Sequence, residues 1–112
     1  MNKKFYKSKD ELKPVAVGYG ACIATDHITV EGKKIGYMYR EEPSENVPAD
    51  NGWRFYSGEE NQEYVDNAKN LSYYDTNTIA NCDPTITPYL TAPIGSAFGK
   101  NENGEFIEEE LI

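Results

Sequence analysis

The chain has 112 residues, which suits one compact domain with a core of its own. Its 11 basic and 19 acidic residues give a formal net charge of −8, and a surface of that sign repels phosphate backbones. No run approaches the roughly 18–20 apolar residues of a membrane helix, and the first residues lack the apolar stretch of a secretory signal. We therefore expect one domain over residues 1–112, located in the cytoplasm, that binds neither nucleic acid nor membrane.

The charge is unevenly distributed along the chain. Residues 1–13 hold five lysines against two acids, whereas the other residues hold six bases against seventeen acids. We predict a basic polar arm over 1–13, with a short helical turn around KDELK, and a folded domain over 14–110. The acidic body would attract a basic partner and speed the encounter, although acidic charge also serves solubility alone.

The first predicted strand lies in the segment VAVGYGACIATDHITV, which is rich in β-branched and small residues and has no helical period. It predicts a strand over about 21–30, with a break near Asp26. Glu31-Gly32 stands between two β-favouring runs. This predicts a tight hairpin turn that brings residues 35–40 back beside the first strand.

A third strand, WRFYS, follows the loop EEPSENVPADNG, which contains two prolines and many turn formers. Alternation places Ile35, Tyr37 and Tyr39 on one face of the second strand and Trp53 and Phe55 on one face of the third. We expect these aromatic residues to pair and close a small core. The indole N–H of Trp53 would then need a hydrogen-bond partner.

Ser57 and Glu60 fit the S-x-x-E capping box, which predicts a short helix at about 59–68. Glu59, Glu60 and Glu63 would lie in its first turns, where the helix dipole favours negative charge. A capped, solvated helix start therefore explains this acidic cluster without any binding function.

The segment NLSYYDTNTIANCDP predicts a strand at 71–75 followed by a short helix, capped by Asp75 or Thr76 and ended at Asp83-Pro84. Asn103-Gly104 predicts a second hairpin between runs 94–99 and 105–109. The fold class is therefore α+β, with a small, mostly antiparallel sheet, hairpins and one or two short helices.

Motifs for catalysis or metal binding are missing from the sequence. His27 is the only histidine, and the two cysteines, Cys22 and Cys82, form neither a CxxC motif nor a disulfide framework. Paired carboxylates are abundant, but none stands in a recognisable catalytic frame. We expect no catalytic residue, no bound metal and no cofactor, and hence a protein that is not an enzyme.

Three segments, CIATDHITVEGKKIGYMYREEP, GWRFYSGEENQEYVDN and YYDTNTIANCDPTITPYLTAPIGSAF, together resemble the immunity-protein-33-like family, also described as a domain of unknown function. The resemblance covers about residues 21–98. It implies a non-enzymatic bacterial protein that binds and neutralises a cognate toxin of a polymorphic toxin system. The family supplies no catalytic residues.

A protein of this kind acts through its surface, and acids beside exposed aromatic residues suit a basic toxin. The predicted partner-binding residues are Glu59, Glu60, Glu63, Asp66, Tyr73, Tyr74 and Asp75. Two alternatives remain open. A small regulatory or ligand-binding module would show an apolar pocket at the aromatic sheet, and an enzyme would show a cleft that joins His27 to a cysteine or a carboxylate.

Overall fold

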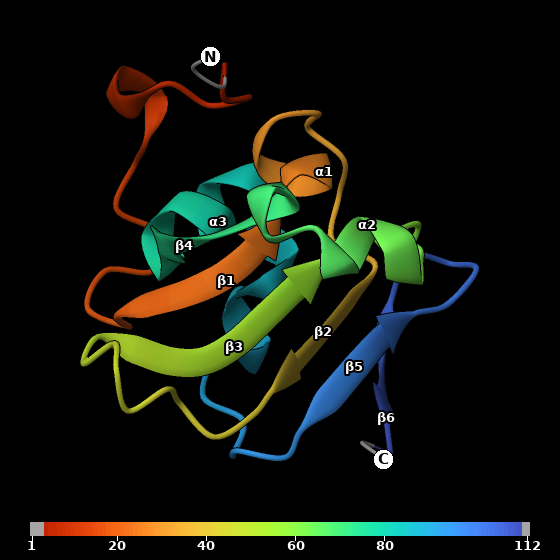
Figure 1. The fold of residues 1–112 in the computed structure, drawn as a ribbon. Coiled ribbons are helices and arrows are strands. Elements are labelled where there is room, and N and C mark those ends of the chain that lie inside the picture. The colour runs from red at the N-terminus through yellow and green to blue at the C-terminus, as the bar shows by residue number, and fades with distance from the viewer. Residues whose placement is uncertain (1–3, 111–112) are drawn as a thin grey trace.

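The computed structural model describes residues 4–110 of the chain, and its six strands form one sheet (Figure 1). The strands are β1 (Ala21–Thr25), β2 (Tyr37–Arg40), β3 (Asp50–Tyr56), β4 (Leu71–Asp75), β5 (Ala97–Lys100) and β6 (Phe106–Glu109). The helices are α1 (Asp26–Thr29), α2 (Gln62–Asp66) and α3 (Thr76–Cys82), with 3-10 turns η1 (Lys9–Glu11), η2 (Ala68–Asn70) and η3 (Pro84–Tyr89). No helix within residues 4–110 is long and apolar enough to span a membrane.

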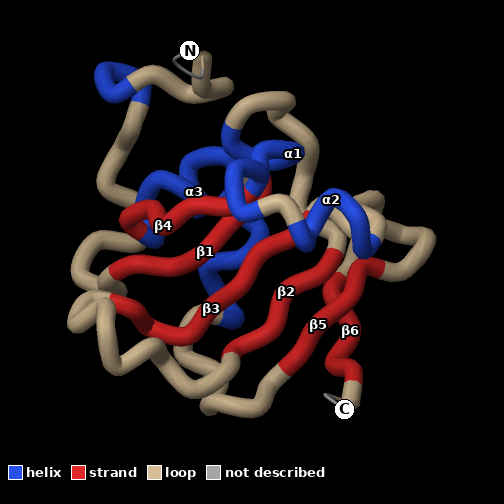
Figure 2. The backbone as a smooth tube through the Cα atoms, in the orientation of Figure 1, coloured by secondary structure: helices blue, strands red, loops and turns tan. Residues whose placement is uncertain are grey.

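The strand order across the sheet is β4-β1-β3-β2-β5-β6. Only β1 and β3 run parallel, and every other neighbouring pair is antiparallel. Helices α1 and α3 lie on one side of the sheet, and α2 sits near one end of β2 and β3 (Figure 2). The α+β fold class with a mostly antiparallel sheet is thereby confirmed.

The hairpin predicted at Glu31-Gly32 is wrong. The first strand ends at Thr25, and the chain turns at once into α1 instead of continuing to residue 30. Gly32 adopts a positive φ of 75°, so its flexibility serves the exit from a helical turn and not a two-residue hairpin loop. As a consequence β1 and β2 are not neighbours, because β3 lies between them.

The core lies between the sheet and the helices on its covered side. Trp53 and Phe55 are 0% and 1% exposed, which confirms their predicted burial, and their rings stack at 5.9 Å. The indole N–H of Trp53 donates to the carbonyl of Leu90 at 3.1 Å. Helices and strands both contribute further core residues: Cys22, Ala24, Ile28, Ile35, Met38, Ile79, Ala80, Ile86, Leu90 and Phe98.

The predicted packing of these rings against Tyr37 and Tyr39 is wrong by one residue of register. Met38 stands opposite Phe55 in the β2–β3 pair, and Tyr39 stands opposite Arg54. Residues directly opposite each other share a face, so the two tyrosines point away from the core. Ile35 does not join them, because it precedes β2 and is buried.

The other predicted elements are found close to where the sequence placed them. Strand β4 leads into α3, and the carboxylate of Asp75 caps that helix by accepting the N–H of Asn77 at 2.9 Å. Strands β5 and β6 form the predicted hairpin, in which Gly104 has a φ of 78°. Helix α2 is shorter than predicted and is capped by Asn61 in place of Ser57.

The N-terminal arm contains the predicted turn, η1, and is attached to the covered side of the fold. The N–H of Tyr6 donates to the carbonyl of Thr29 at 2.7 Å, and the ring of Phe5 packs edge-on against Tyr74 at 5.9 Å. Residues 1–3 of the predicted arm lie outside the described residues, as do residues 111–112.

Candidate functional site: the open face of the sheet

The side of the sheet opposite α1 and α3 has no helix lying across its strands in the described part of the chain (Figures 1 and 2). Register pairs show which side chains share this side, because residues directly opposite each other point the same way. We call this surface the open face and define it by Ile23, Tyr37, Tyr39, Arg54, Tyr56, Tyr73, Gly99, Ile107 and Glu109. Tyr73 and Ile107 are well exposed on it.

Three tyrosines form a cluster on the open face. The ring centroids of Tyr37 and Tyr39 are 5.9 Å apart, those of Tyr37 and Tyr56 are 6.3 Å apart, and the rings of Tyr39 and Tyr56 stack at 5.9 Å and 11°. A tyrosine hydroxyl is neutral near pH 7 in any case, and burial raises the pKa of Tyr37 and of Tyr56 further. The cluster forms one wall of a depression of about 380 Å³. The other lining residues are Gly58, Glu60 and Val65.

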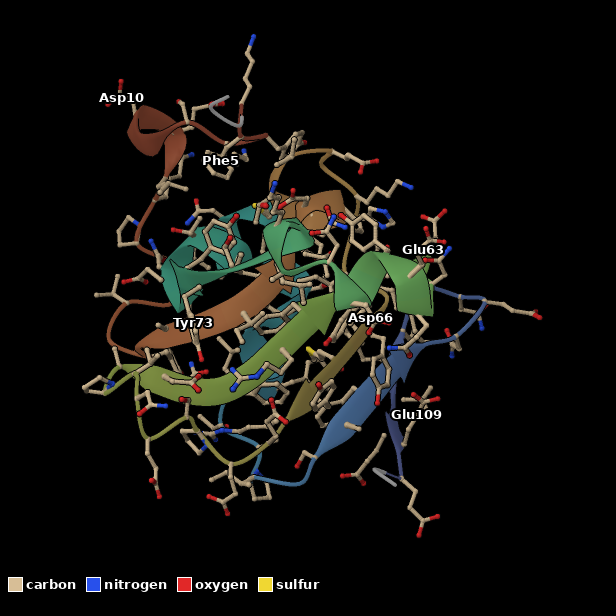
Figure 3. All side chains as sticks on the ribbon, viewed as in Figure 1. Phe5, Asp10, Glu63, Asp66, Tyr73 and Glu109 are labelled. Carbon is tan, nitrogen blue, oxygen red and sulfur yellow. The ribbon has the colours of Figure 1, made fainter. Side chains whose placement is uncertain are left out.

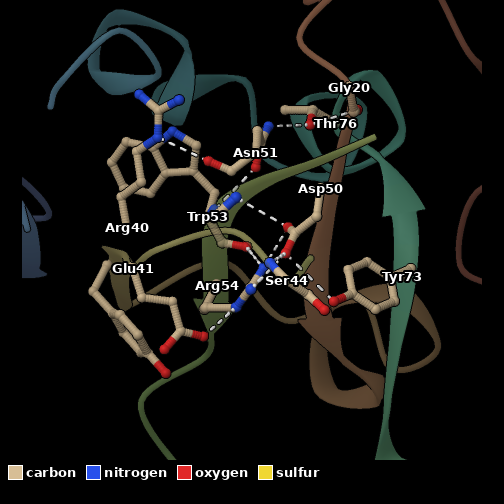
Figure 4. A network of polar contacts seen from close by, with 12 residues as sticks. Gly20, Arg40, Glu41, Ser44, Asp50, Asn51, Trp53, Arg54, Tyr73 and Thr76 are labelled. Carbon is tan, nitrogen blue, oxygen red and sulfur yellow. Dashed lines mark hydrogen bonds and ion pairs between the residues drawn. The ribbon is translucent and has the colours of Figure 1, made fainter. Parts of the chain in front are cut away.

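Arg54 is the cation of the open face, and a buried carboxylate neutralises it (Figure 4). Its Nη1 and Nη2 atoms each donate to one oxygen of Asp50 at 2.8 Å, and its Nε donates to Glu41 at 2.6 Å. The hydrogen bonds from Arg54 hold the pKa of Asp50 well below its ordinary range, although burial opposes them. Tyr73 completes the group, since its ring lies 6.0 Å from the guanidinium. The open face therefore exposes little positive charge.

Glu60 is a predicted partner-binding residue that the fold turns inward. Its side chain is only 2% exposed. Oε2 accepts from Thr25 Oγ1 at 2.5 Å and from the N–H of Ser57 at 2.8 Å, and Oε1 accepts from the N–H of Gly58 at 3.0 Å. Burial disfavours the charged form, but these hydrogen bonds outweigh it and lower the pKa of Glu60. The carboxylate therefore organises the turn after β3 at one end of the depression.

The other predicted acids of this segment stand on the surface, as Figure 3 shows for Glu63 and Asp66. The side chain of Glu59 is 66% exposed and lies 3.3 Å from Lys33 Nζ. Asp66 accepts a hydrogen bond from Gln62 at 2.7 Å. These three acids, which we call the α2 acids, border the end of the open face where α2 sits.

The remaining predicted residues, in β4, point alternately to the two sides of the sheet. Tyr73 lies on the open face. Tyr74 lies on the covered side, where its hydroxyl is 3.1 Å from Thr29 Oγ1. Asp75 is exposed, but its carboxylate caps α3. The structure thus brings Tyr73 and the α2 acids to one surface and sends Tyr74 elsewhere.

Several residues of the open face were missed by the sequence prediction. Tyr37 and Tyr39 were assigned to the core, and Tyr56, Ile107 and Glu109 were not considered as site residues. Strand alternation was a sufficient signal for grouping Tyr37 with Tyr39, but it could not say which side the helices cover. That side is decided by the pairing of β2 with both β3 and β5.

Of the groups considered for catalysis, His27 lies beside a carboxylate, and the two cysteines belong to the buried core. Nδ1 of His27 lies 2.8 Å from Ser57 Oγ and 3.5 Å from Glu60 Oε2, beside the turn after β3. Cys22 and Cys82 are free and buried, and burial raises the pKa of the Cys22 thiol to about 12, which makes it a poor nucleophile. Within residues 4–110 no three His, Cys, Asp or Glu side chains converge as a metal site requires.

In the comparison with known families, a model described as the Immunity protein Imm33 domain matches residues 22–110. The matched stretch runs from β1 to β6, includes the whole open face and leaves out the N-terminal arm. It confirms the family that the sequence resembles. Comparisons with curated proteins and with solved structures give no match.

Proposed function

The chain belongs to the family of immunity proteins with the Imm33 domain, and from this premise we propose that it neutralises a cognate toxin by binding it with the open face. Membership of this family favours a non-enzymatic role and a toxin as the partner. The toxin would be part of a bacterial polymorphic toxin system, and binding would take place in the cytoplasm of the cell that the immunity protein protects.

The observation that carries the proposal is the uncovered, aromatic side of the sheet. Tyrosine supplies a large contact area at little conformational cost and is enriched at protein interfaces. The open face has four tyrosines from three strands, together with Ile23 and Ile107. A partner that covered it would bury apolar area in the centre and leave the acids at the edge, as in a typical interface.

The charges around the open face favour a basic toxin. Arg54 is neutralised by Asp50, whereas Glu109 and the α2 acids stand at the border. Complementary charge of this kind speeds association and excludes acidic proteins. The predicted acidic patch therefore contributes to the proposed surface through Glu59, Glu63 and Asp66, while Glu60 acts behind it.

Binding of the toxin encoded beside this protein tests the proposal. Ile107→Ala removes a side chain from a residue that is 51% exposed on the open face, and Ile94→Ala removes the same atoms from a residue that is 46% exposed in the loop before β5. We expect Ile107→Ala to weaken the complex in calorimetry and Ile94→Ala to leave it unchanged. Equal effects would place the interface elsewhere, and failure of the unmodified protein to bind the toxin would reject the proposal.

The second candidate function is a small ligand-binding module, which the depression of about 380 Å³ beside the tyrosine cluster favours. This volume is within the range of small-molecule sites. Mass spectrometry of the protein purified from its own host, under non-denaturing conditions, distinguishes the two. A stoichiometric small molecule in place of a protein partner would favour the module.

A further inference from the structure

We propose that the depression lined by Tyr37, Tyr39, Tyr56 and Glu60 receives an arginine side chain of the partner protein. The inference rests on the proposed toxin binding and names the group that the open face recognises. We call this depression the tyrosine pocket.

The aromatic wall of the tyrosine pocket has the shape that a guanidinium requires. The rings of Tyr39 and Tyr56 are parallel within 11°, and Tyr37 stands tilted beside both at 5.9 and 6.3 Å. A guanidinium is planar and weakly hydrated, so it stacks on a flat aromatic surface at a smaller desolvation cost than an ammonium group. Arginine is accordingly frequent among the residues that dominate interface energies.

Two carboxylates add negative charge, one in the lining of the pocket and one beside it. Glu60 contributes to the lining and is held ionised by hydrogen bonds from Thr25 and from the turn after β3. Glu109, on β6, is not part of the lining and extends over β5. A Cβ atom added to Gly99 would lie 2.5 Å from Glu109 Oε2, so that carboxylate occupies the space that a side chain at Gly99 would take.

The register places this second carboxylate beside the aromatic wall. Gly99 stands opposite Tyr37 in the β2–β5 pair, and the pKa of Tyr37 is raised first by burial and then by the charge of Glu109. A glycine at this position therefore allows an acid from the outermost strand to lie flat on the sheet near the tyrosine ring. Ring faces and carboxylates together attract a cation more strongly than either does alone.

No cation of the described strands is placed to fill the pocket. Arg54 is the only basic residue on the open face among those strands, and both of its ends are bound, to Asp50 and to Glu41. The lining of the pocket itself contains no basic residue. His27, on α1, lies 3.5 Å from Glu60 Oε2 but is not part of the lining. We therefore expect the cation at the aromatic wall to come from another molecule, which on the proposed function is the toxin.

Titration with N-acetyl-arginine methylamide tests the pocket without the toxin. The neutral N-acetyl-citrulline methylamide, which has nearly the same shape, is the matched probe. In protein labelled with carbon-13 in its tyrosine rings, we expect the arginine probe to shift the signals of Tyr37, Tyr39 and Tyr56 in a saturable way, and the citrulline probe to do so far less. Equal shifts with both probes, or no saturable shift with arginine, would overturn the inference.

Paired variants show whether binding of the arginine probe depends on the tyrosine ring or on its hydroxyl, and on the local charge or on the total charge. Tyr39→Leu removes one ring of the aromatic wall and should weaken binding of the arginine probe about fivefold, whereas Tyr39→Phe keeps the ring and should retain this binding. Glu109→Gln should weaken binding severalfold. Glu102→Gln, at an exposed position in the β5–β6 turn, removes the same charge and should have no effect.

The same variants applied to the toxin complex separate the two proposals. If toxin binding is insensitive to Tyr39→Leu and Glu109→Gln but sensitive to Ile107→Ala, the proposed arginine site is wrong and the proposed toxin binding stands. If the arginine probe binds but the toxin does not, the proposed toxin binding is wrong and the arginine site stands. Loss of toxin binding in Tyr39→Leu, with retention in Tyr39→Phe, supports both.

Discussion

The two faces of the sheet carry similar aromatic residues, but these residues are buried in the core on one face and line an uncovered surface on the other. Along β3, Trp53 and Phe55 point to the covered side and are fully enclosed, whereas Arg54 and Tyr56 point to the open face. Both sides are aromatic, so composition does not distinguish them. The difference is what covers each side: α3 and η3 pack over one side, whereas on the other side α2 lies only at one end of β2 and β3 (Figure 1). Stability is thus concentrated on one side, which leaves aromatic area available for recognition on the other.

The largest difference between the two faces should appear in stability. Trp53→Ala leaves a cavity and removes the hydrogen bond to Leu90, and we expect the free energy of unfolding to fall by about 3–5 kcal/mol. Tyr73→Ala, which shortens an exposed ring on the open face, should cost no more than about 1 kcal/mol. Urea denaturation of both variants measures the difference between their free energies of unfolding. Similar losses would mean that the open face is also part of the stabilising core.

A buried ion pair should make one part of the open face an exception. Asp50→Asn leaves Arg54 with one of its two carboxylate partners, and we expect the free energy of unfolding to fall by about 3 kcal/mol. Asp66→Asn, on the surface of α2, should leave the free energy of unfolding nearly unchanged. Because the pKa of Asp50 is lowered in the folded protein, its stabilisation is present above the ordinary aspartate pKa of about 3.9.

That stabilisation is lost as the pH falls from this value towards the lower folded pKa. The difference in unfolding free energy between the original protein and Asp50→Asn should therefore be constant near neutral pH and shrink below about pH 4. Denaturation curves recorded from pH 7 to pH 3 measure it. A difference that disappears already at pH 6 would show that another group is responsible.

A smaller effect should separate two neighbouring acids that the sequence presents as equivalent. Glu60→Gln replaces a carboxylate oxygen, which accepts hydrogen bonds, by an amide N–H₂, which cannot accept from the three donors around it. We expect the free energy of unfolding to fall by about 2 kcal/mol. Glu59→Gln, at a side chain that is 66% exposed, should stay within about 0.5 kcal/mol of the original protein. Thermal or urea unfolding of the two variants is sufficient. A larger loss in Glu59→Gln would contradict the inward orientation of Glu60.

The smallest effect on stability should accompany a clear effect on binding kinetics. Glu59→Lys combined with Glu63→Lys reverses the charge of two exposed α2 acids, so unfolding should change by no more than about 0.5 kcal/mol while toxin association slows and loses part of its salt dependence. Glu102→Lys with Glu105→Lys makes the same charge change in the β5–β6 turn and serves as the control. The association rate of each double variant is measured at two salt concentrations. Equal changes in the two double variants would mean that association depends on the net charge of the protein and not on the position of the acids.

Local sequence signals were reliable where one short segment determines the outcome. The cap at Asp75, the helix end at Asp83-Pro84 and the hairpin at Asn103-Gly104 were all predicted and are present, because each depends on backbone geometry within a few residues. The hairpin at Glu31-Gly32 rested on a weaker signal. A glycine with positive φ fits a helix exit as well as a hairpin, and in this protein it follows α1.

The sequence by itself determined the α+β class, the family, the burial of Trp53 and the acidic character of the segment after β3. It did so because composition, local turn chemistry and short sequence motifs can be recognised without knowing how distant segments pair. Only the tertiary structure decided that Tyr37 and Tyr39 face outward and that Glu60 faces inward. These orientations depend on β3 inserting between β1 and β2, a pairing of segments distant along the chain, and a shift of one residue in such a pairing exchanges the two faces of a strand.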